Sequence, residues 1–417
     1  MKRVLFISCL FAGAALMLSF YSGEDWGFWG HRRINRMAVF TLPPEMIGFY
    51  KKNIEYITEH AVDPDKRRYA TRHEAVRHYI DADHWGEYPF PALPRDWNDA
   101  LMKFTEVGLV TMAGDTLLLS RDTVALNGDT GQEVFVALHM GDYRVAANYD
   151  RAYRGFFIKN ILPQYYEDEW VVDCDSLCAL FGITPGSLDC QSAFAVDRLS
   201  EYGILPYHLL AMQRRLTEAF RQKDEARILR LSAEMGHYIG DGNVPLHTTE
   251  NYNGQMTNQV GIHAFWESRI PELFADKTFD YFVGKAEYIS RPKEYFWNMV
   301  LASHALVDSV LSIERQLSID FPADKQYCYE ERLGQTIRTQ CEDYAAAYNE
   351  RLSGMVEARL RSSIQAIGSS WYTAWADAGQ PDLRALGEHL PTLVETQEME
   401  ELEKQVRGGE KKGRPHE

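Results

Sequence analysis

The sequence predicts a mainly α-helical protein with a small β-rich insertion. From Leu205 onward, apolar residues recur at spacings of three and four, as they do on one face of a helix. Between about residues 105 and 200, short β-prone runs alternate with Gly-Asp and Asn-Gly-Asp turn signals. We therefore expect an antiparallel bundle of helices. Its periodic segments are Tyr207 to Lys223, Ala226 to Asp241, His263 to Phe274, Pro292 to Leu317 and Glu330 to Trp375.

Turn-forming and helix-breaking residues indicate the structure of the segments before and inside the insertion. Arg32 to Tyr56 is helical in pattern, and Pro43-Pro44 predicts a break followed by a new helix start. Residues 62–97 read as loop between short helices. Within the insertion, Val134 to Met140 fits a strand and a helix equally well.

The two ends of the chain differ from the middle. Lys2 and Arg3 precede an apolar stretch, so residues 1–23 read as a signal peptide of an exported protein, periplasmic or secreted. The alternative is an uncleaved membrane anchor. No later segment is apolar for long enough, so we expect no integral membrane domain after signal removal. Residues 24–390 would form the folded domain, and the charged tail 391–417 would be disordered.

Composition limits the class of partner. The chain has 417 residues, is 45% hydrophobic, and carries 44 Lys and Arg against 60 Asp and Glu, a formal net charge of -16. An acidic surface argues against duplex nucleic acid. Divalent ions in a cleft would still make that cleft locally positive, which suits a short phosphate-bearing substrate.

The cysteine count limits disulfide pairing in an exported protein. If Cys9 leaves with the signal, five cysteines remain, so at least one thiol is free or pairs with another chain. Cys174, Cys178 and Cys190 lie close together, and we expect one disulfide among them.

The densest cluster of chemistry-bearing residues is HYIGDGNVPLH followed by GIHAFWE. His237 and Asp241 are four residues apart, as are His263 and Glu267, so each pair falls on one helical face. Pro245 interrupts the helix and frees His247 to turn toward a neighbouring ion. Histidine with carboxylate, without cysteine, favours zinc over magnesium.

Two upstream segments offer further ligands, and with them the chain resembles a known superfamily. These segments are WGFWGH, Trp26 to His31, and AVDPDKRRY with RHYIDAD, which contains Asp63 and His78. With them the chain resembles the zinc-dependent phospholipase C and S1/P1 nuclease superfamily. The resemblance implies a multi-helix bundle whose three-zinc cleft hydrolyses phosphate esters, and it covers neither the insertion nor the tail.

The resemblance also implies which residues hold each ion. Asp63, His78, His237 and Asp241 would form the first zinc site, and His247, His263 and Glu267 the second. His31 would hold a third ion with the main chain of Trp26, and Asp241 would bridge the first and third ions. We thus expect two zinc ions, with a third at a less complete site.

Two points in this assignment stay open. Asp65 competes with Asp63, because an Asp-Pro-Asp loop can present either carboxylate, and Asp63 is favoured. The family's tryptophan is the mature N-terminus, whereas Glu24 and Asp25 precede Trp26 here. Either a second protease trims the end, or the third ion is bound differently, for example through Glu24 or Asp25, or it is bound weakly.

The expected function is that of an exported zinc-dependent phosphodiester hydrolase. Zinc would activate water against phosphorus, with Asp63 as the catalytic base. The substrate would be a phospholipid headgroup or a short single-stranded nucleic acid. Glu267, where the nucleases usually carry aspartate, favours phospholipase C-like activity over an S1/P1-type nuclease or nucleotidase. A non-catalytic, zinc-stabilised binding protein is the alternative of another class.

Overall fold

A computed structural model describes residues 27–125, 134–332, 335–409 and 412. The predicted signal peptide, Trp26, Glu24 and Asp25 lie outside the described residues. Helices account for 59% of the structure and strands for 11%, so the fold is mainly α. The chain divides into two compact units, Met1–Ala92 with Tyr202–Glu417, and Leu93–Glu201.

The helices of the first unit agree in large part with the apolar spacing. Pro44 begins a helix, as predicted, because a proline at the first helical position needs no hydrogen-bond acceptor for a backbone N–H. The helices that precede the long bundle are α2 (Gly27–Ala38), α3 (Pro44–Lys52), α4 (Ile54–Glu59), α5 (Asp63–Arg67) and α6 (Arg72–Ala75). The later ones are α10 (Leu205–Gln222), α11 (Glu225–Asn243), α12 (Ile262–Ala264), α13 (Asp276–Thr278), α14 (Pro292–His304), α15 (Val307–Asp320), α16 (Glu342–Arg351) and α17 (Met355–Asp377).

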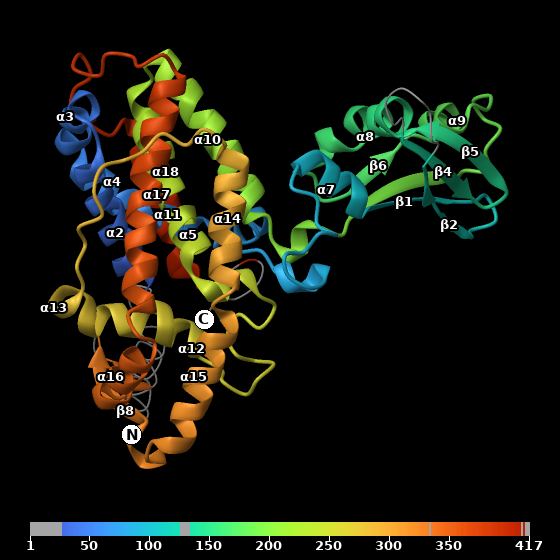
Figure 1. Cartoon of the computed structure of the whole chain (residues 1–417). Helices are drawn as coiled ribbons and strands as arrows, with labels where there is room; N and C mark the ends of the chain where they lie inside the picture. Colours follow the sequence, from blue (N-terminus) through green and yellow to red (C-terminus); the bar gives the residue numbers. More distant parts are fainter. Residues whose placement is uncertain (1–26, 126–133, 333–334, 410–411, 413–417) are drawn as a thin grey trace, which may run out of the picture. The chain divides into compact units, whose positions relative to one another are not determined.

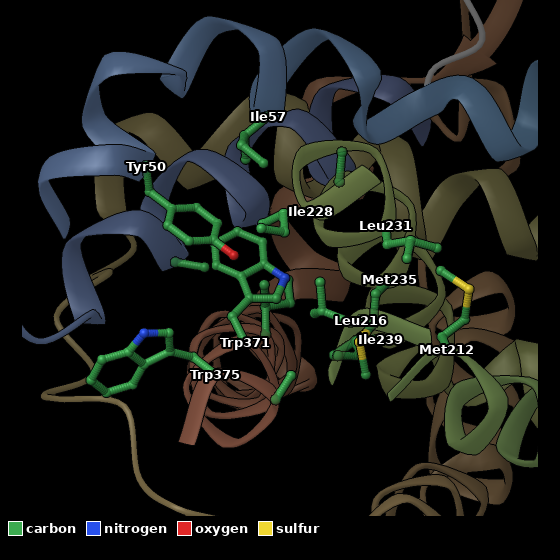
Figure 2. Packing of buried hydrophobic residues seen from close by; sticks show 14 of the residues in the cluster. Tyr50, Ile57, Met212, Leu216, Ile228, Leu231, Met235, Ile239, Trp371 and Trp375 are labelled. Carbon is green, nitrogen blue, oxygen red and sulfur yellow. The ribbon is translucent and has the colours of Figure 1, made fainter. Parts of the chain in front are cut away.

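The main core lies where α17 packs on α10 and α11 (Figure 1). Figure 2 shows Trp371 of α17 lying against Tyr50 of α3, and the two rings stack with centroids 4.9 Å apart. Both polar groups find a partner on Ser232, because the indole donates to its carbonyl at 3.1 Å and the phenol lies 2.9 Å from its hydroxyl. The core thus buries large aromatic rings without leaving these polar atoms unpaired.

Two glycines let α2 approach α11 closely. A Cβ at Gly236 would lie 1.8 Å from Asn35 Oδ1, and one at Gly240 would lie 2.9 Å from His31 Nδ1. Asn35 uses this proximity to donate to the Ala233 carbonyl at 2.9 Å. The contact brings His31 against the helix that carries His237 and Asp241.

The segment after α12 is wound more widely than an α-helix. Two π-helical turns follow, η8 (Phe265–Arg269) and η9 (Pro271–Ala275). Phe265 packs in a second core with Tyr344 and Tyr348 of α16. Wide turns of this kind often occur at functional sites.

A hairpin replaces the start of the helix predicted from Glu330 to Trp375. Strand β8 (Tyr327–Arg332) pairs antiparallel with β9 (Gln335–Gln340), and the Cys328–Cys341 disulfide joins their ends. Aromatic and β-branched residues at Tyr327, Tyr329 and Thr339 favour strands. Helix therefore resumes only at Glu342.

The second unit contains the predicted β-prone segment. One antiparallel sheet has the order β2-β1-β7-β6, and another has the order β3-β4-β5. Val134 to Met140, open to either reading from the sequence, is a strand. Cys174 and Cys190 form a disulfide, and Cys178 is a buried free thiol. The elements of this unit are α7 (Trp97–Phe104), β1 (Thr105–Val110), β2 (Thr116–Leu118), β3 (Ser120–Ala125), β4 (Val134–Met140), β5 (Tyr143–Asn148), α8 (Arg154–Asn160), β6 (Trp170–Val172), α9 (Cys174–Phe181) and β7 (Ser192–Asp197).

The charged tail is not disordered over its whole length, contrary to the prediction. Helix α18 spans Leu393–Gly408 and starts with a reciprocal capping box between Thr392 and Glu395. Glu403 on this helix pairs with Lys66 of α5 at 2.9 Å. Glutamate, glutamine and lysine are good helix formers, so a low apolar content did not exclude a helix here.

One helical stretch of the described residues, Pro292–Asp320, is long and apolar enough to cross a membrane by length and composition alone. The apolar runs of the sequence predicted no such stretch after the signal peptide. It is divided where α14 ends and α15 begins, and part of its surface is buried among other helices. Buried core helices share this composition, so the finding is weak evidence for a span.

Candidate metal centre

Eight side chains from distant parts of the first unit converge in one buried cluster. They offer five imidazoles and three carboxylates, and their nitrogen and oxygen atoms fall into four overlapping groups in which all atoms lie within 4.8 Å of one another. Groups of this composition could hold metal ions. The members are His31 on α2, Asp65 on α5, His78 after α6, His237 and Asp241 on α11, His247 in the turn Pro245–Thr248, His263 on α12, and Glu267 on η8.

The first group contains His78, His237 and Asp241, with Asp65 at its edge. His78 Nδ1 lies 3.1 Å from His237 Nε2 and 3.0 Å from Asp241 Oδ2, and His237 Nε2 lies 3.4 Å from the same oxygen. Asp65 Oδ1 lies 3.7 Å from both imidazole nitrogens. Ligands about 2.0–2.1 Å from a tetrahedral ion would be separated by roughly 3.3 Å, so this spacing suits one ion.

The second group contains His247, His263 and Glu267. Glu267 Oε2 lies 3.3 Å from His247 Nε2 and 2.8 Å from His263 Nε2. The sequence spacing predicted the helical contact between His263 and Glu267. The turn that begins at Pro245 brings His247 to the same oxygen.

Asp241 and His31 connect these groups. Asp241 directs Oδ2 to the first group, while its Oδ1 lies 3.4 Å from His31 Nε2 and 3.9 Å from His247 Nε2. His31 also approaches Glu267 Oε1 at 3.7 Å. The two oxygens of Asp241 therefore face different groups.

Backbone carbonyls fix the orientation of three imidazoles. The Nδ1 atoms of His237, His247 and His263 lie within hydrogen-bonding distance of the carbonyl oxygens of Ala61 (2.8 Å), His78 (2.7 Å) and Tyr252 (3.1 Å). A carbonyl can only accept, so each Nδ1 donates its proton. In the neutral ring, the lone pair of Nε2 then points into the cluster, as in a histidine that ligates a metal.

The buried carboxylates and neutral imidazoles of the cluster could hold a cation. Burial lowers the pKa of His78 and His237 well below the usual value and that of His247 to about 4, so these rings are neutral near pH 7. Burial, together with the nearby carboxylates, raises the pKa of Asp241 well above its usual value. Asp241 Oδ2 is buried and accepts no hydrogen bond from the described residues. A divalent ion would satisfy this oxygen and the converging lone pairs at once.

Asp63, the favoured ligand and base from the sequence, does not join these groups. Its Oδ2 lies 2.6 Å from His60 Nδ1, and its Oδ1 lies 3.6 Å from Lys66 Nζ. Asp65 occupies the expected place instead. The two residues lie two positions apart on α5, about 200° around the helix, so only one carboxylate can face the cluster. The sequence contains both aspartates, but no pattern in it indicates which of them lies on the side of α5 that faces the cluster.

The Asn-Tyr-Asn segment after His247 holds a ligand in place. Tyr252 supplies the carbonyl that accepts from His263, and Asn253 Oδ1 accepts from the backbone N–H of Gly261 at 2.9 Å. Trp26, the remaining predicted ligand, lies outside the described residues.

Comparison with known proteins adds no family assignment: neither the scan against protein-family models nor the search of curated proteins gives a match.

Proposed function

We propose that the protein is a zinc-dependent hydrolase of phosphoric esters, phospholipase C-like in activity. We also propose that its helical unit is a member of the superfamily of zinc-dependent phospholipases C and S1/P1 nucleases. The observation that carries the proposal is the convergence of eight ligand-type side chains, drawn from His31 to Glu267, with three of the imidazoles held by backbone carbonyls so that Nε2 faces the cluster.

The donor set supports zinc. Five imidazoles with three carboxylates form a mixed nitrogen and oxygen environment, whereas magnesium and calcium favour oxygen ligands. The first ion would be held by Asp65, His78, His237 and Asp241, and the second by His247, His263 and Glu267. His31 and Asp241 would contribute to a third. Zinc in these positions would supply Lewis-acid charge to phosphate oxygens and lower the pKa of a water ligand toward about 7.

The carboxylates of the chain would orient and deprotonate the attacking water. Asp65 is the residue that we assign as general base, in place of Asp63, because its Oδ1 lies at the edge of the first group. Its side chain is 18% exposed, compared with 1% for that of Asp241, so it can reach solvent. Asp241, enclosed between groups, would bridge ions.

Charge and ligand identity favour a phospholipid headgroup. The chain carries a net charge of -16, whereas proteins that bind single-stranded nucleic acid usually offer a basic groove. A glutamate at position 267, where the related nucleases usually carry aspartate, points the same way. Export from the cell, predicted from residues 1–23, would bring the enzyme to lipid surfaces.

The proposal is tested by pairing metal analysis with two substrates. We expect native mass spectrometry of the mature protein to find two or three zinc ions, and the loaded protein to hydrolyse phosphatidylcholine micelles faster than a short single-stranded oligonucleotide. Turnover of the oligonucleotide alone would assign a nuclease. Stoichiometric zinc without hydrolysis of any phosphoester would favour a zinc-stabilised binding protein.

The assignment of Asp65 is tested separately. Asp65→Asn should abolish most of the activity and change the acidic limb of the pH–rate profile, while the matched Asp63→Asn variant should keep both. The reverse result would return the role to Asp63.

A further inference from the structure

The π-helical turn that carries Glu267 is held from its opposite side. Glu267 and Arg269 both lie on η8, two residues apart. Glu267 faces His247 and His263 in the second metal group. Arg269 faces the β8–β9 hairpin and is 3% exposed. The turn is therefore fixed between the metal group and the hairpin.

Arg269 binds both strands of that hairpin. Its Nε donates to the carbonyl of Gln340 on β9 at 3.1 Å. Its guanidinium also forms a two-point ion pair with Glu330 on β8, with one nitrogen 3.1 Å from Oε2 and the other on Oε1. A planar guanidinium paired at two points fixes direction as well as distance, which a lysine cannot do.

The disulfide keeps the two acceptors in register. Glu330 lies opposite Ile337 and Gln340 lies opposite Tyr327, so both acceptors depend on correct pairing of the strands. A two-stranded hairpin alone is marginally stable. The Cys328–Cys341 disulfide closes this one.

The same segment also fixes the beginning of η8. Helix α16 starts at Glu342, directly after the disulfide-bonded Cys341. Its Tyr344 stacks on Phe265 with ring centroids 5.6 Å apart, and Tyr348 contacts the same ring at 4.8 Å. The hairpin and α16 thus hold both ends of the turn that presents Glu267.

We propose that Arg269 is a positioning residue for Glu267, and that the disulfide-closed hairpin sets the metal affinity of the second group. This inference rests on the proposed zinc function. Residues that orient metal ligands typically change metal affinity by about 10–100-fold when they are lost. The first group receives no ligand from η8, so its affinity should change less.

The test measures zinc binding rather than activity. The pair of Arg269 with Glu330 and the disulfide-closed hairpin together form what we call the brace of η8. The variants Glu330→Gln and Cys328→Ser/Cys341→Ser weaken this brace without altering a ligand. Stepwise zinc dissociation constants from competition with a chromophoric chelator give the affinities. The His263→Ala variant identifies which step belongs to the second group. Co²⁺ substitution adds an absorption spectrum that reports the coordination geometry.

Matched controls come from the same chain. Glu331→Gln changes the adjacent carboxylate on β8, which accepts from Thr336 rather than from Arg269. Cys174→Ser/Cys190→Ser removes the disulfide of the other unit. Both controls should retain the affinities of the unchanged protein.

We expect both brace variants to weaken the second step about 10–100-fold and to alter the Co²⁺ spectrum, with a smaller change in the first step. Affinities within twofold of the controls would overturn the inference while leaving the zinc enzyme intact. Absence of zinc binding in the unchanged protein would instead overturn the proposed function.

Discussion

Replacing Asp241 by asparagine should change the stability of the metal-free and zinc-loaded proteins in opposite directions. In the metal-free protein, this buried carboxylate lies near Asp65 and Glu267, which raise its pKa together with burial. Asparagine removes the charge while keeping the shape. Its amide can also donate to the lone pair of His237 Nε2, 3.4 Å from Asp241 Oδ2. We therefore expect the metal-free variant to unfold at a higher temperature.

The zinc-loaded variant should lose stability, because Asp241 serves two groups. If the zinc affinity falls 100-fold, saturation with zinc stabilises the fold by about 2.7 kcal/mol less. With an unfolding entropy of about 2.1 cal/mol/K per residue, a chain of 417 residues shifts its unfolding temperature by about 1 °C per kcal/mol, so the expected loss is about 3 °C.

Calorimetry of chelated and zinc-saturated samples measures both effects. Asp63→Asn is the matched control, since its carboxylate contacts His60 and Lys66 outside the metal groups, and it should leave the zinc-dependent gain unchanged. Equal destabilisation of the two forms by Asp241→Asn would refute the reasoning.

Two further predictions concern the approach of α2 and the titration of the imidazoles. Gly240→Ala should destabilise the protein by about 1–3 kcal/mol, because the new Cβ would lie 2.9 Å from His31. Native mass spectrometry should also find one bound ion fewer in this variant. The control Gly48→Ala, whose Cβ meets nothing within 4 Å, should show neither effect. Burial lowers the pKa of His247 to about 4, whereas the pKa of this side chain in the unfolded chain is about 6.5. The free energy of unfolding of the metal-free protein should therefore be highest above pH 6.5 and should fall by about 3 kcal/mol as the pH is lowered to about 4. Denaturant titrations of chelated protein should show this loss, and an unchanged pH dependence in His247→Gln would contradict it.

Much of the candidate centre was accessible from sequence because its ligands come in local pairs. His237 with Asp241, and His263 with Glu267, lie four residues apart, and helical geometry alone brings each pair together. Asp63 was favoured over Asp65 because residue spacing does not show which face of a short helix meets the cluster. Both aspartates belong to the short helix α5, and tertiary packing decides which face meets the cluster.

The errors in the fold have a similar origin. Glu330 begins a stretch with helix-compatible spacing, yet the Cys328–Cys341 disulfide and β-branched neighbours stabilise a hairpin there. The helix α18 was missed because apolar content was used to judge order, whereas a capping box and a pair with Lys66 support it. In both segments, contacts between residues far apart in the sequence determine the secondary structure.

The carbonyls that orient His237, His247 and His263 belong to the main chain, so the geometry of these rings does not depend on a bound ion. A zinc centre of the proposed kind would therefore meet three imidazoles that the backbone already orients. If zinc occupies the cluster as proposed, we expect Co²⁺ to replace it without changing these contacts, and the larger Cd²⁺ to move the rings away from the carbonyls that hold them.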